Sequence, residues 1–179
     1  MNNTARHITL ITPEPGHIDI MMKWENDPSH WKAGESNIPY SRHAMEQLLL
    51  EATQNAFEQK QLRFLIQLTG DNNNQLIGTA DLFDINPLHR RAGTGILISK
   101  DFRKKGYAYL ALEKLIYYAF HDLWLQQLYA NILADNTGSI KLFEKAGFQK
   151  TGTKKAWIKT PDKYLNEEFY QLLNPAYHQ

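Results

Sequence analysis

The sequence predicts a mixed sheet of the α/β (α+β) class with helices on its faces. In the first half, two apolar runs on either side of a polar turn predict an antiparallel hairpin. In the second half, strand, helix and strand follow one another with short connections, an order that predicts a parallel pair. A length of 179 residues is within the usual size of one domain, so the whole chain, 1–179, is expected to form a single domain.

The first half is expected to supply the antiparallel strands. Its expected elements are, in order, a strand at 8–11, a helix at 18–25, a helix at 41–57 and strands at 62–68, 75–83 and 91–98. The helix at 41–57 opens at Ser41, whose hydroxyl can accept a hydrogen bond from the first turn. Gly70 and the polar residues after it mark the turn of the hairpin.

The second half is expected to supply the parallel connection. Its expected elements are a helix at 105–121, a strand at 128–133, a helix at 136–145, a strand from 148 onward and a last strand at 168–173. In the first of these helices, Ala108, Leu112, Leu115 and Ala119 recur at helical spacing, which places them on one face toward a core. Gly147 is expected to end the second helix.

The composition excludes several classes of function. Lys and Arg number 20 and Asp and Glu 19, so a net charge of +1 gives no global attraction to nucleic acid or to an anionic membrane. The absence of cysteine excludes a disulfide framework, a thiolate nucleophile and a cysteine zinc site. No histidine has another at helical ligand spacing, so no metal is expected. Without a long apolar run or a signal-like start, we expect a cytoplasmic protein.

The segment 103–108, Arg-Lys-Lys-Gly-Tyr-Ala, is suited to bind a pyrophosphate. A helix start leaves backbone N–H groups without helical partners and carries partial positive charge. Gly106 lets a phosphate approach the backbone, and the three basic residues before it add charge. The hexapeptide alone is equally compatible with an ordinary solvated turn.

Two further patterns lie near this turn. Gly93 and Gly95 lack the third glycine of a dinucleotide fingerprint and lie inside a strand, where glycine marks a bulge or the close approach of a ligand. The motif Asn-Thr-Gly-Ser at 136–139 opens a helix, and plain capping by Asn136 accounts for it. The combination of this motif with the basic turn after the preceding strand favours one ligand site that uses both.

With these motifs in this order, the sequence resembles the GNAT superfamily of N-acetyltransferases over essentially the whole chain. The turn at 103–108 fits the Arg/Gln-x-x-Gly-x-Gly/Ala signature of that family, and 136–148 resembles its Asn-x-x-Ser helix followed by Lys-Ala-Gly-Phe. The stretch 78–86, with His-Arg-Arg at 89–91, further resembles the spermidine and ribosomal-protein N-terminal acetyltransferase branch.

The resemblance implies direct transfer of an acetyl group from acetyl-CoA to an amine within a ternary complex. It also implies a mostly antiparallel sheet of six to seven strands with a splayed parallel central pair and a bulge in the fourth strand. The acceptor would be a small molecule or a peptide, and the chain would form a homodimer or a higher homo-oligomer. No metal, nucleic acid or membrane is implied.

The resemblance also implies roles for individual residues. The acetyl-CoA site would comprise Gly95, Ile96, Leu97, Ile98, Arg103, Lys104, Lys105, Gly106, Tyr107, Ala108, Asn131, Asn136, Ser139, Lys141 and Phe143. Phe143 stands where many members have a tyrosine that is thought to protonate the leaving thiolate. Either Ser139 supplies that proton, or no acid is needed, or catalysis is weak. Leaving a thiol with a pKa near 8.5 unprotonated costs only about 2 kcal/mol at pH 7, which favours the second interpretation.

The acceptor amine creates a demand for carboxylates. Deprotonating an alkylamine with a pKa near 10.4 costs about 4 to 5 kcal/mol at pH 7, against about 1 kcal/mol for an α-amine. The candidate bases are Glu25, Asp27, Glu35, Asp81 and Asp84, and for any single one of them a solvated surface carboxylate is the favoured interpretation. In a regular strand Asp81 and Asp84 face opposite sides, so both can line one cleft only if a bulge intervenes.

Three functions are therefore considered. The first is an acetyl-CoA-dependent N-acetyltransferase that acts on a polyamine-like molecule or on a protein N-terminus, with Ser139, Glu25, Asp81 and Asp84 as candidate catalytic residues. The second, suggested by Phe143, is a catalytically weak or inactive acyl-CoA-binding module. The third is an aminoglycoside acetylase. Release of CoA with a panel of amines would distinguish them.

Overall fold

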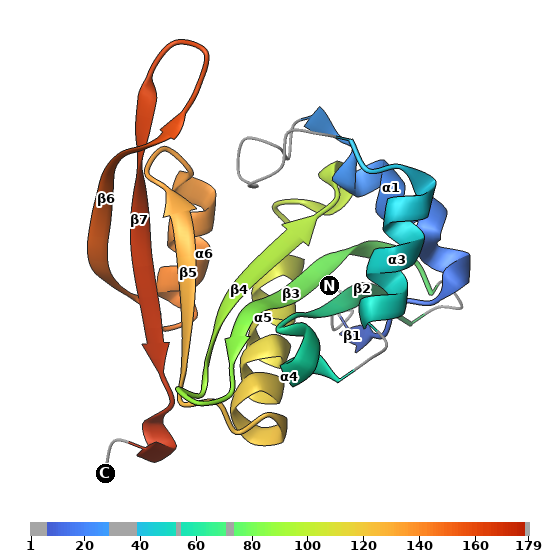
Figure 1. Ribbon diagram of the computed structural model, residues 1–179, viewed down its shortest axis with the longest axis horizontal. Helices are drawn as coiled ribbons and strands as arrows, with labels where there is room; N and C mark the ends of the chain where they lie inside the picture. Colours follow the sequence, from blue (N-terminus) through green and yellow to red (C-terminus); the bar gives the residue numbers. More distant parts are fainter. Residues whose placement is uncertain (1–6, 29–38, 53–54, 71–73, 178–179) are drawn as a thin grey trace, which may run out of the picture.

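The computed structural model describes residues 7–28, 39–52, 55–70 and 74–177, and it confirms the mixed sheet (Figure 1). Seven strands lie in the order β1-β2-β3-β4-β5-β7-β6. They are β1 (His7–Ile11), β2 (Leu62–Thr69), β3 (Leu76–Asn86), β4 (Arg91–Ile98), β5 (Gln127–Leu133), β6 (Gln149–Lys159) and β7 (Tyr164–Leu173). The β4–β5 pair is parallel and the other five pairs are antiparallel, as expected.

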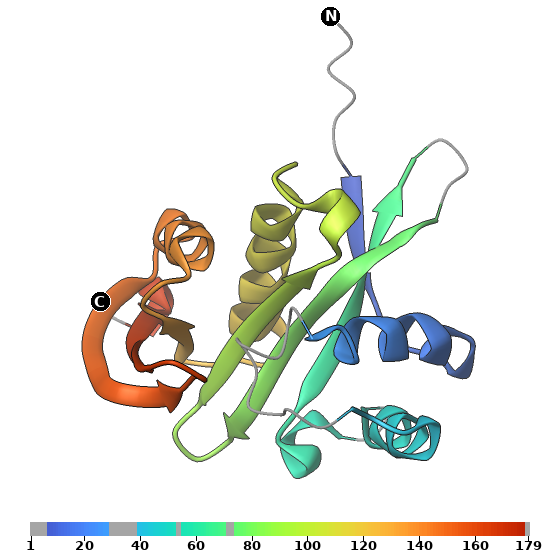
Figure 2. The ribbon, with the colours of Figure 1, turned by 90° about the horizontal axis from the view of Figure 1, so that it is seen from above.

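Helices cover both faces of the sheet (Figure 2). The longer ones are α1 (Ile18–Glu25), α3 (Arg42–Ala52), α5 (Tyr107–Tyr117) and α6 (Thr137–Lys145), with the short α4 (Ala56–Gln59) before β2. Helices α1 and α3 lie on one face, and α5 and α6 on the other. None of the helices in the described ranges is long and apolar enough to cross a membrane.

The strand period of two separates the apolar core into two layers. Leu65 and Ile66 are neighbours in β2, yet Leu65 packs with α1 and α3, whereas Ile66 belongs to the larger cluster that includes α5 and α6. On β4, Ala92 and Ile98 belong to the larger cluster, and Leu97 packs against the smaller one. Alternate residues of β4 therefore face either α5 and α6 or α1 and α3.

Two helix boundaries differ from the expectation. The helix expected at 41–57 is two helices, because the Asn55 side chain accepts a hydrogen bond from the Phe57 amide and its extended backbone starts α4 anew. The helix expected at 105–121 begins only at Tyr107, because Gly106 has a left-handed backbone. It then widens into a π-turn, η3 (Tyr118–Asp122).

The central parallel pair is splayed, as the resemblance implied. Pairing joins Arg91 to Gln127, Ala92 to Leu128 and Gly93 to Tyr129. Both strands continue beyond these pairs, β4 to Ile98 and β5 to Leu133, and Figure 1 shows them diverging. Peptide groups on the β5 side of β4 are therefore available to an extended ligand between the strands.

Candidate active site

The basic turn before α5 lies at the open end of the splayed pair. It follows β4 through the short helix η2 (Lys100–Phe102), and Gly106 begins α5 with a φ of 84°. A side chain is disfavoured at this left-handed position, so the turn favours glycine there. The Arg103 Nε donates to the Ile98 carbonyl over 2.8 Å, which ties the turn to the end of β4.

The basic side chains of the turn are exposed, and two are anchored by their neighbours. Besides the bond of Arg103, Lys105 Nζ donates to the Asp101 carbonyl over 2.7 Å. Lys104 has a φ of 58°, which completes the tight turn. Tyr107 and Ala108 lie half-buried against the core. Three exposed positive charges at a helix N-terminus form a surface that attracts an anionic group.

The predicted site residues of β4 alternate between the two faces. Gly95 and Leu97 face α1 and α3, and Ile96 and Ile98 face α5 and α6. The register with β3 is continuous from Gly78–Ile98 to Phe83–Gly93, so the bulge expected in this strand is not found at 95–97.

Gly93 has a different role from the one expected. A Cβ built on Gly93 would lie 2.2 Å from the Phe83 ring, so the missing side chain makes room for that ring. The break in the β3–β4 register falls instead between Phe83 and Asn86, where Asp84 has a φ of 47°. The bulge is therefore in β3.

The motif that opens α6 acts as a helix cap. Asn136 Oδ1 accepts a hydrogen bond from the Ser139 amide over 3.1 Å. Ser139 is half-buried in the first turn, and Lys141 is exposed. Asn131 on β5 is exposed and accepts a hydrogen bond from Lys154 over 3.2 Å.

Phe143 lies in the apolar core rather than on an open surface. It is 3% exposed, and its ring contacts the edge of Phe148 with a centroid distance of 5.0 Å. A hydroxyl at this position would be placed in apolar surroundings.

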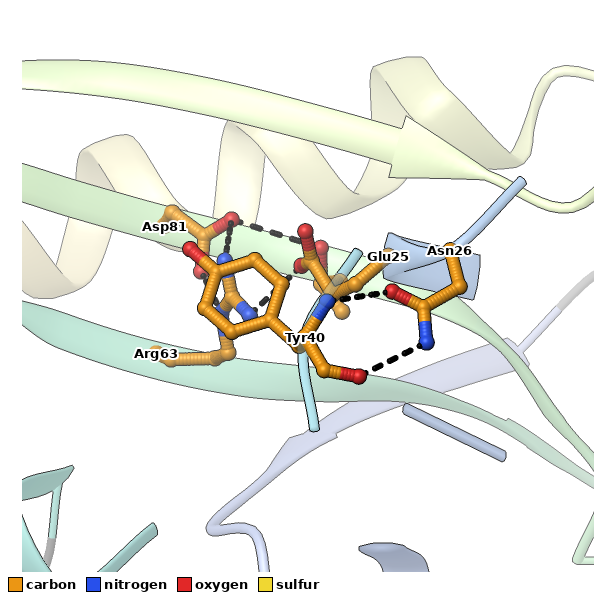
Figure 3. Close-up of polar contacts among 6 residues, drawn as sticks. Glu25, Asn26, Tyr40, Arg63 and Asp81 are labelled. Atoms are coloured by element: carbon orange, nitrogen blue, oxygen red, sulfur yellow. Dashed lines mark hydrogen bonds and ion pairs between the residues drawn. The ribbon is translucent and has the colours of Figure 1, made fainter. Parts of the chain in front are cut away.

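Two of the candidate bases are joined by a largely buried cation (Figure 3). Arg63 Nε donates to Asp81 Oδ1 over 2.7 Å, its Nη2 contacts the second oxygen at 3.3 Å, and its Nη1 donates to Glu25 Oε1 over 2.6 Å. Thr79 also donates to Asp81. The structure therefore brings Glu25 and Asp81 together through Arg63.

The Arg63 cluster carries one net negative charge, from two carboxylates and one guanidinium. Burial by itself lowers the pKa of Arg63, but the charges of Asp81 and Glu25 and the hydrogen bonds to them outweigh burial and raise that pKa above its ordinary value. Arg63 was not among the site residues expected from the sequence. The feature of the sequence that could have indicated it is a single basic residue within a mostly apolar strand.

Asp84 lies apart from this cluster, beside three aromatic rings. It is exposed, and its Oδ2 accepts a hydrogen bond from the Tyr129 hydroxyl over 3.0 Å. The Tyr129 ring meets Phe83 edge to face at 5.9 Å and stacks on Phe169 at 5.4 Å. We call Phe83, Asp84, Tyr129 and Phe169 the apex corner, because Tyr129 belongs to the last β4–β5 pair before the strands diverge.

The remaining candidates are placed as follows. Asp27 forms an ion pair with Lys100 at 3.1 Å, and Glu35 lies outside the described residues. Within the part of the chain that the structure describes, no three His, Asp or Glu side chains gather as a metal site would require.

Comparisons with known proteins agree on one family. The family model described as "Acetyltransferase (GNAT) domain" matches residues 7–149. A probable N-acetyltransferase of Bacillus subtilis, YjcK, is 32% identical over 58% of this chain and 58% of its own length. A spermidine N(1)-acetyltransferase of Vibrio cholerae is 30% identical over 60% of this chain and 54% of its own length. These alignments thus span little more than half of either relative.

Other matches extend over the whole chain. An uncharacterized N-acetyltransferase of Bacillus licheniformis, p20, is 27% identical over 97% of this chain and 96% of its own length. Among solved structures, the spermidine N-acetyltransferase of V. cholerae in complex with CoA and spermine superposes with a TM-score of 0.84 at 23% identity, covering 96% of this chain and 98% of that one. The same enzyme in complex with manganese ions gives 0.77 at 24% identity, covering 93% and 92%. These structures share the fold.

Proposed function

Because the chain belongs to the GNAT acetyltransferase family, we propose that it transfers the acetyl group of acetyl-CoA to a primary amine of a polyamine such as spermidine. One observation carries the proposal: a strand pair that separates beyond Gly93 and Tyr129, with a basic helix N-terminus at its open end. This arrangement suits a long ligand with an anionic head. The V. cholerae relative named as a spermidine N(1)-acetyltransferase supports the choice of acceptor.

The residues of the turn fit the pyrophosphate of acetyl-CoA. Gly106 leaves the backbone open, and Arg103, Lys104 and Lys105 surround it with exposed positive charge. The pantetheine arm would extend from this turn between the diverging parts of β4 and β5. There, peptide groups of β4 can pair with its amides as they would with a neighbouring strand.

The apex corner fits the ammonium groups of a polyamine. The Asp84 carboxylate supplies charge, and the faces of Phe83, Tyr129 and Phe169 favour an organic cation. Asp84 accepts its hydrogen bond from an uncharged hydroxyl, whereas Glu25 and Asp81 share the positive charge of Arg63. Asp84 is therefore the carboxylate we assign to the acceptor, and the Arg63 cluster supports the sheet beside it.

In the proposed reaction the acceptor amine attacks the thioester directly. The chain binds both substrates, aligns the amine where β4 and β5 begin to separate, and excludes water from the pantetheine arm. Proximity of this kind accounts for a large part of the rate that such an enzyme can achieve. The departing thiolate is a fair leaving group without a strong acid, which is consistent with phenylalanine at position 143.

Release of free CoA in the presence of different amines tests this function. The panel comprises spermidine, a peptide with a free N-terminus and an aminoglycoside, each with acetyl-CoA and purified protein. We expect release with spermidine, and identification of N-acetylspermidine by mass spectrometry. Release with the peptide or the aminoglycoside alone would contradict the proposed acceptor.

A second candidate function rests on Phe143. If none of the amines is acetylated while calorimetry shows binding of acetyl-CoA, the chain is an acyl-CoA-binding module rather than an enzyme. Failure to bind acetyl-CoA would contradict both functions.

A further inference from the structure

One buried hydroxyl of β4 has no hydrogen-bond partner. Thr94 is 3% exposed, and within the described residues its Oγ1 is the buried side-chain polar atom left without a bond. Leaving a hydroxyl unsatisfied in an apolar interior costs free energy, because the bond it makes with water in the unfolded chain is lost. Thr79, equally buried on the adjacent strand, differs in this respect because its hydroxyl donates to Asp81.

Thr94 lies where the central pair separates. It is the residue of β4 directly after Gly93, which makes the last pair with β5. Its side chain shares a face with Ala92 and Ile98, both of which belong to the core layer of α5 and α6. The unpaired hydroxyl is therefore on the face from which α5 presents its basic N-terminus.

Strand β4 runs continuously from Thr94 to the end at which the exposed turn lies. Ile98, to which Arg103 is bonded, marks the end of the strand near the turn. Thr94 lies four residue steps before Ile98 along the extended strand, roughly 13 Å at 3.3 Å per residue. An arm whose pyrophosphate lies at the turn and which follows this face of β4 brings its reacting end to Thr94.

We propose that the Thr94 hydroxyl donates a hydrogen bond to the sulfur of CoA when the thioester is cleaved. The proposal rests on the proposed function, because it assigns a residue to that reaction. The amine nitrogen forms a bond with the acetyl carbon, the carbon–sulfur bond breaks, and its electron pair leaves on sulfur. Thr94 stabilises this negative charge without giving up its proton, and the excess proton of the amine passes to water.

This contact would supply part of what a tyrosine at position 143 supplies in other members of the family. Thr94 keeps its proton and stabilises charge, so it is a hydrogen-bond donor and not a general acid. It also explains why an unsatisfied hydroxyl is retained in the core. The free protein loses stability at this position, and the hydroxyl is satisfied only as charge develops on the ligand.

The stability of Thr94→Val gives the first test. Valine keeps the shape and removes the hydroxyl, so we expect the melting temperature of the ligand-free protein to stay level or rise. Thr79→Val removes a hydroxyl that is bonded, and its melting temperature should fall. A melting temperature for Thr94→Val that falls as far as that of Thr79→Val would overturn the proposal.

The kinetics of the same variant give the second test. A hydrogen bond to a developing charge is lost in kcat, so we expect kcat of Thr94→Val to fall about 10- to 100-fold while KM for acetyl-CoA changes little. Thr94→Ser keeps the hydroxyl and should recover most of the rate. An unchanged kcat in Thr94→Val, or a failure of Thr94→Ser to recover it, would contradict the proposed contact.

A titration without any amine separates this inference from the proposed function. The thiol of bound CoA can be followed by its thiolate absorbance as pH is raised. A hydrogen bond to sulfur favours the thiolate, so the bound thiol should titrate at lower pH in the native protein than in Thr94→Val. Coincident titration curves would overturn the contact even if the protein is an acetyltransferase. Separate curves would support it even if spermidine is not the acceptor.

Discussion

At the scale of single residues, the largely buried Arg63 engages the two carboxylates beside it, Glu25 and Asp81, in ion pairs. Its side chain is 11% exposed, and those of Glu25 and Asp81 are 21% and 17% exposed. Carboxylates held this way link α1 and β3 to β2 through Arg63. Removing the cation would leave two partly buried carboxylates uncompensated, which makes Arg63 hard to replace.

Removing Arg63 should destabilise the fold. Arg63→Met leaves two partly buried carboxylates side by side, and we expect a loss of about 3 kcal/mol in the free energy of unfolding measured with urea. Arg42→Met is the matched control, because its ion pair with Asp19 is exposed and should be worth less than about 1 kcal/mol. Equal losses in the two variants would show that the Arg63 cluster is not needed for stability.

Ser139 and Phe143 test how the thiolate leaves. If departure needs no general acid, Ser139→Ala should change kcat by less than about threefold, because the thiol pKa is near 8.5. Phe143→Tyr should then raise kcat only modestly and lower the melting temperature, because its hydroxyl enters the apolar contact with Phe148. A fall in kcat of about 10² or more in Ser139→Ala, with unchanged affinity for CoA, would instead assign the proton to Ser139.

At the scale of elements, the turn into α5 combines a left-handed backbone at Gly106 with the proposed pyrophosphate surface. Gly106→Val places a side chain both in the left-handed region and against the path of a pyrophosphate. We expect calorimetry to show an affinity for CoA at least about tenfold lower, since loss of even one charge-assisted contact has this size.

Gly70→Val is the control for backbone strain. Gly70 also has a positive φ, of 124°, and a side chain there meets nothing within 4 Å. This variant should share the loss of stability but bind CoA normally. Equal affinity in native protein and folded Gly106→Val would show that the pyrophosphate lies elsewhere.

The elements were predictable from sequence where local patterns determine them. The hairpin and the strand at 91–98 follow from apolar runs bounded by turn residues, and the start of α6 follows from the cap at Asn136. The break between α3 and α4 near Asn55 was not predictable, because a capping residue type such as asparagine can also lie inside a continuous helix.

Residues of the candidate site also differ in whether a local sequence pattern predicts their position. The basic turn is contiguous in sequence, so a short motif predicted its position. The Arg63 cluster and the apex corner join residues from separate strands, and only the sheet register brings them together. The bulge at Asp84 needs a positive φ that an aspartate seldom adopts, so alternation could not predict it.

At the scale of the whole molecule, the chain consists of two sheet halves that meet at three residue pairs. One half comprises β1 to β4 and the other comprises β5 to β7. A ligand that lies between β4 and β5 contacts both halves. Binding is therefore expected to stabilise the junction more than either half.

Hydrogen exchange should detect this effect. On addition of acetyl-CoA, amides of residues 94–98 should exchange more slowly, because peptide groups on the free edge of β4 gain partners. Amides of β1, on the outer edge of the sheet, should change little. Equal protection of β1 and residues 94–98 would indicate general stabilisation and not binding in the splay.

The narrow junction also has a consequence for the folding pathway. Hairpins such as β2–β3 and β6–β7 join neighbours in sequence and can form early, whereas the parallel pair must bring Gly93 to Tyr129 across the whole of α5. Closure of that loop is then a late event, and interactions at the junction would be absent from the transition state. Substitutions at the junction should mainly accelerate unfolding. The lifetime of the native state therefore depends on the three residue pairs that join β4 to β5.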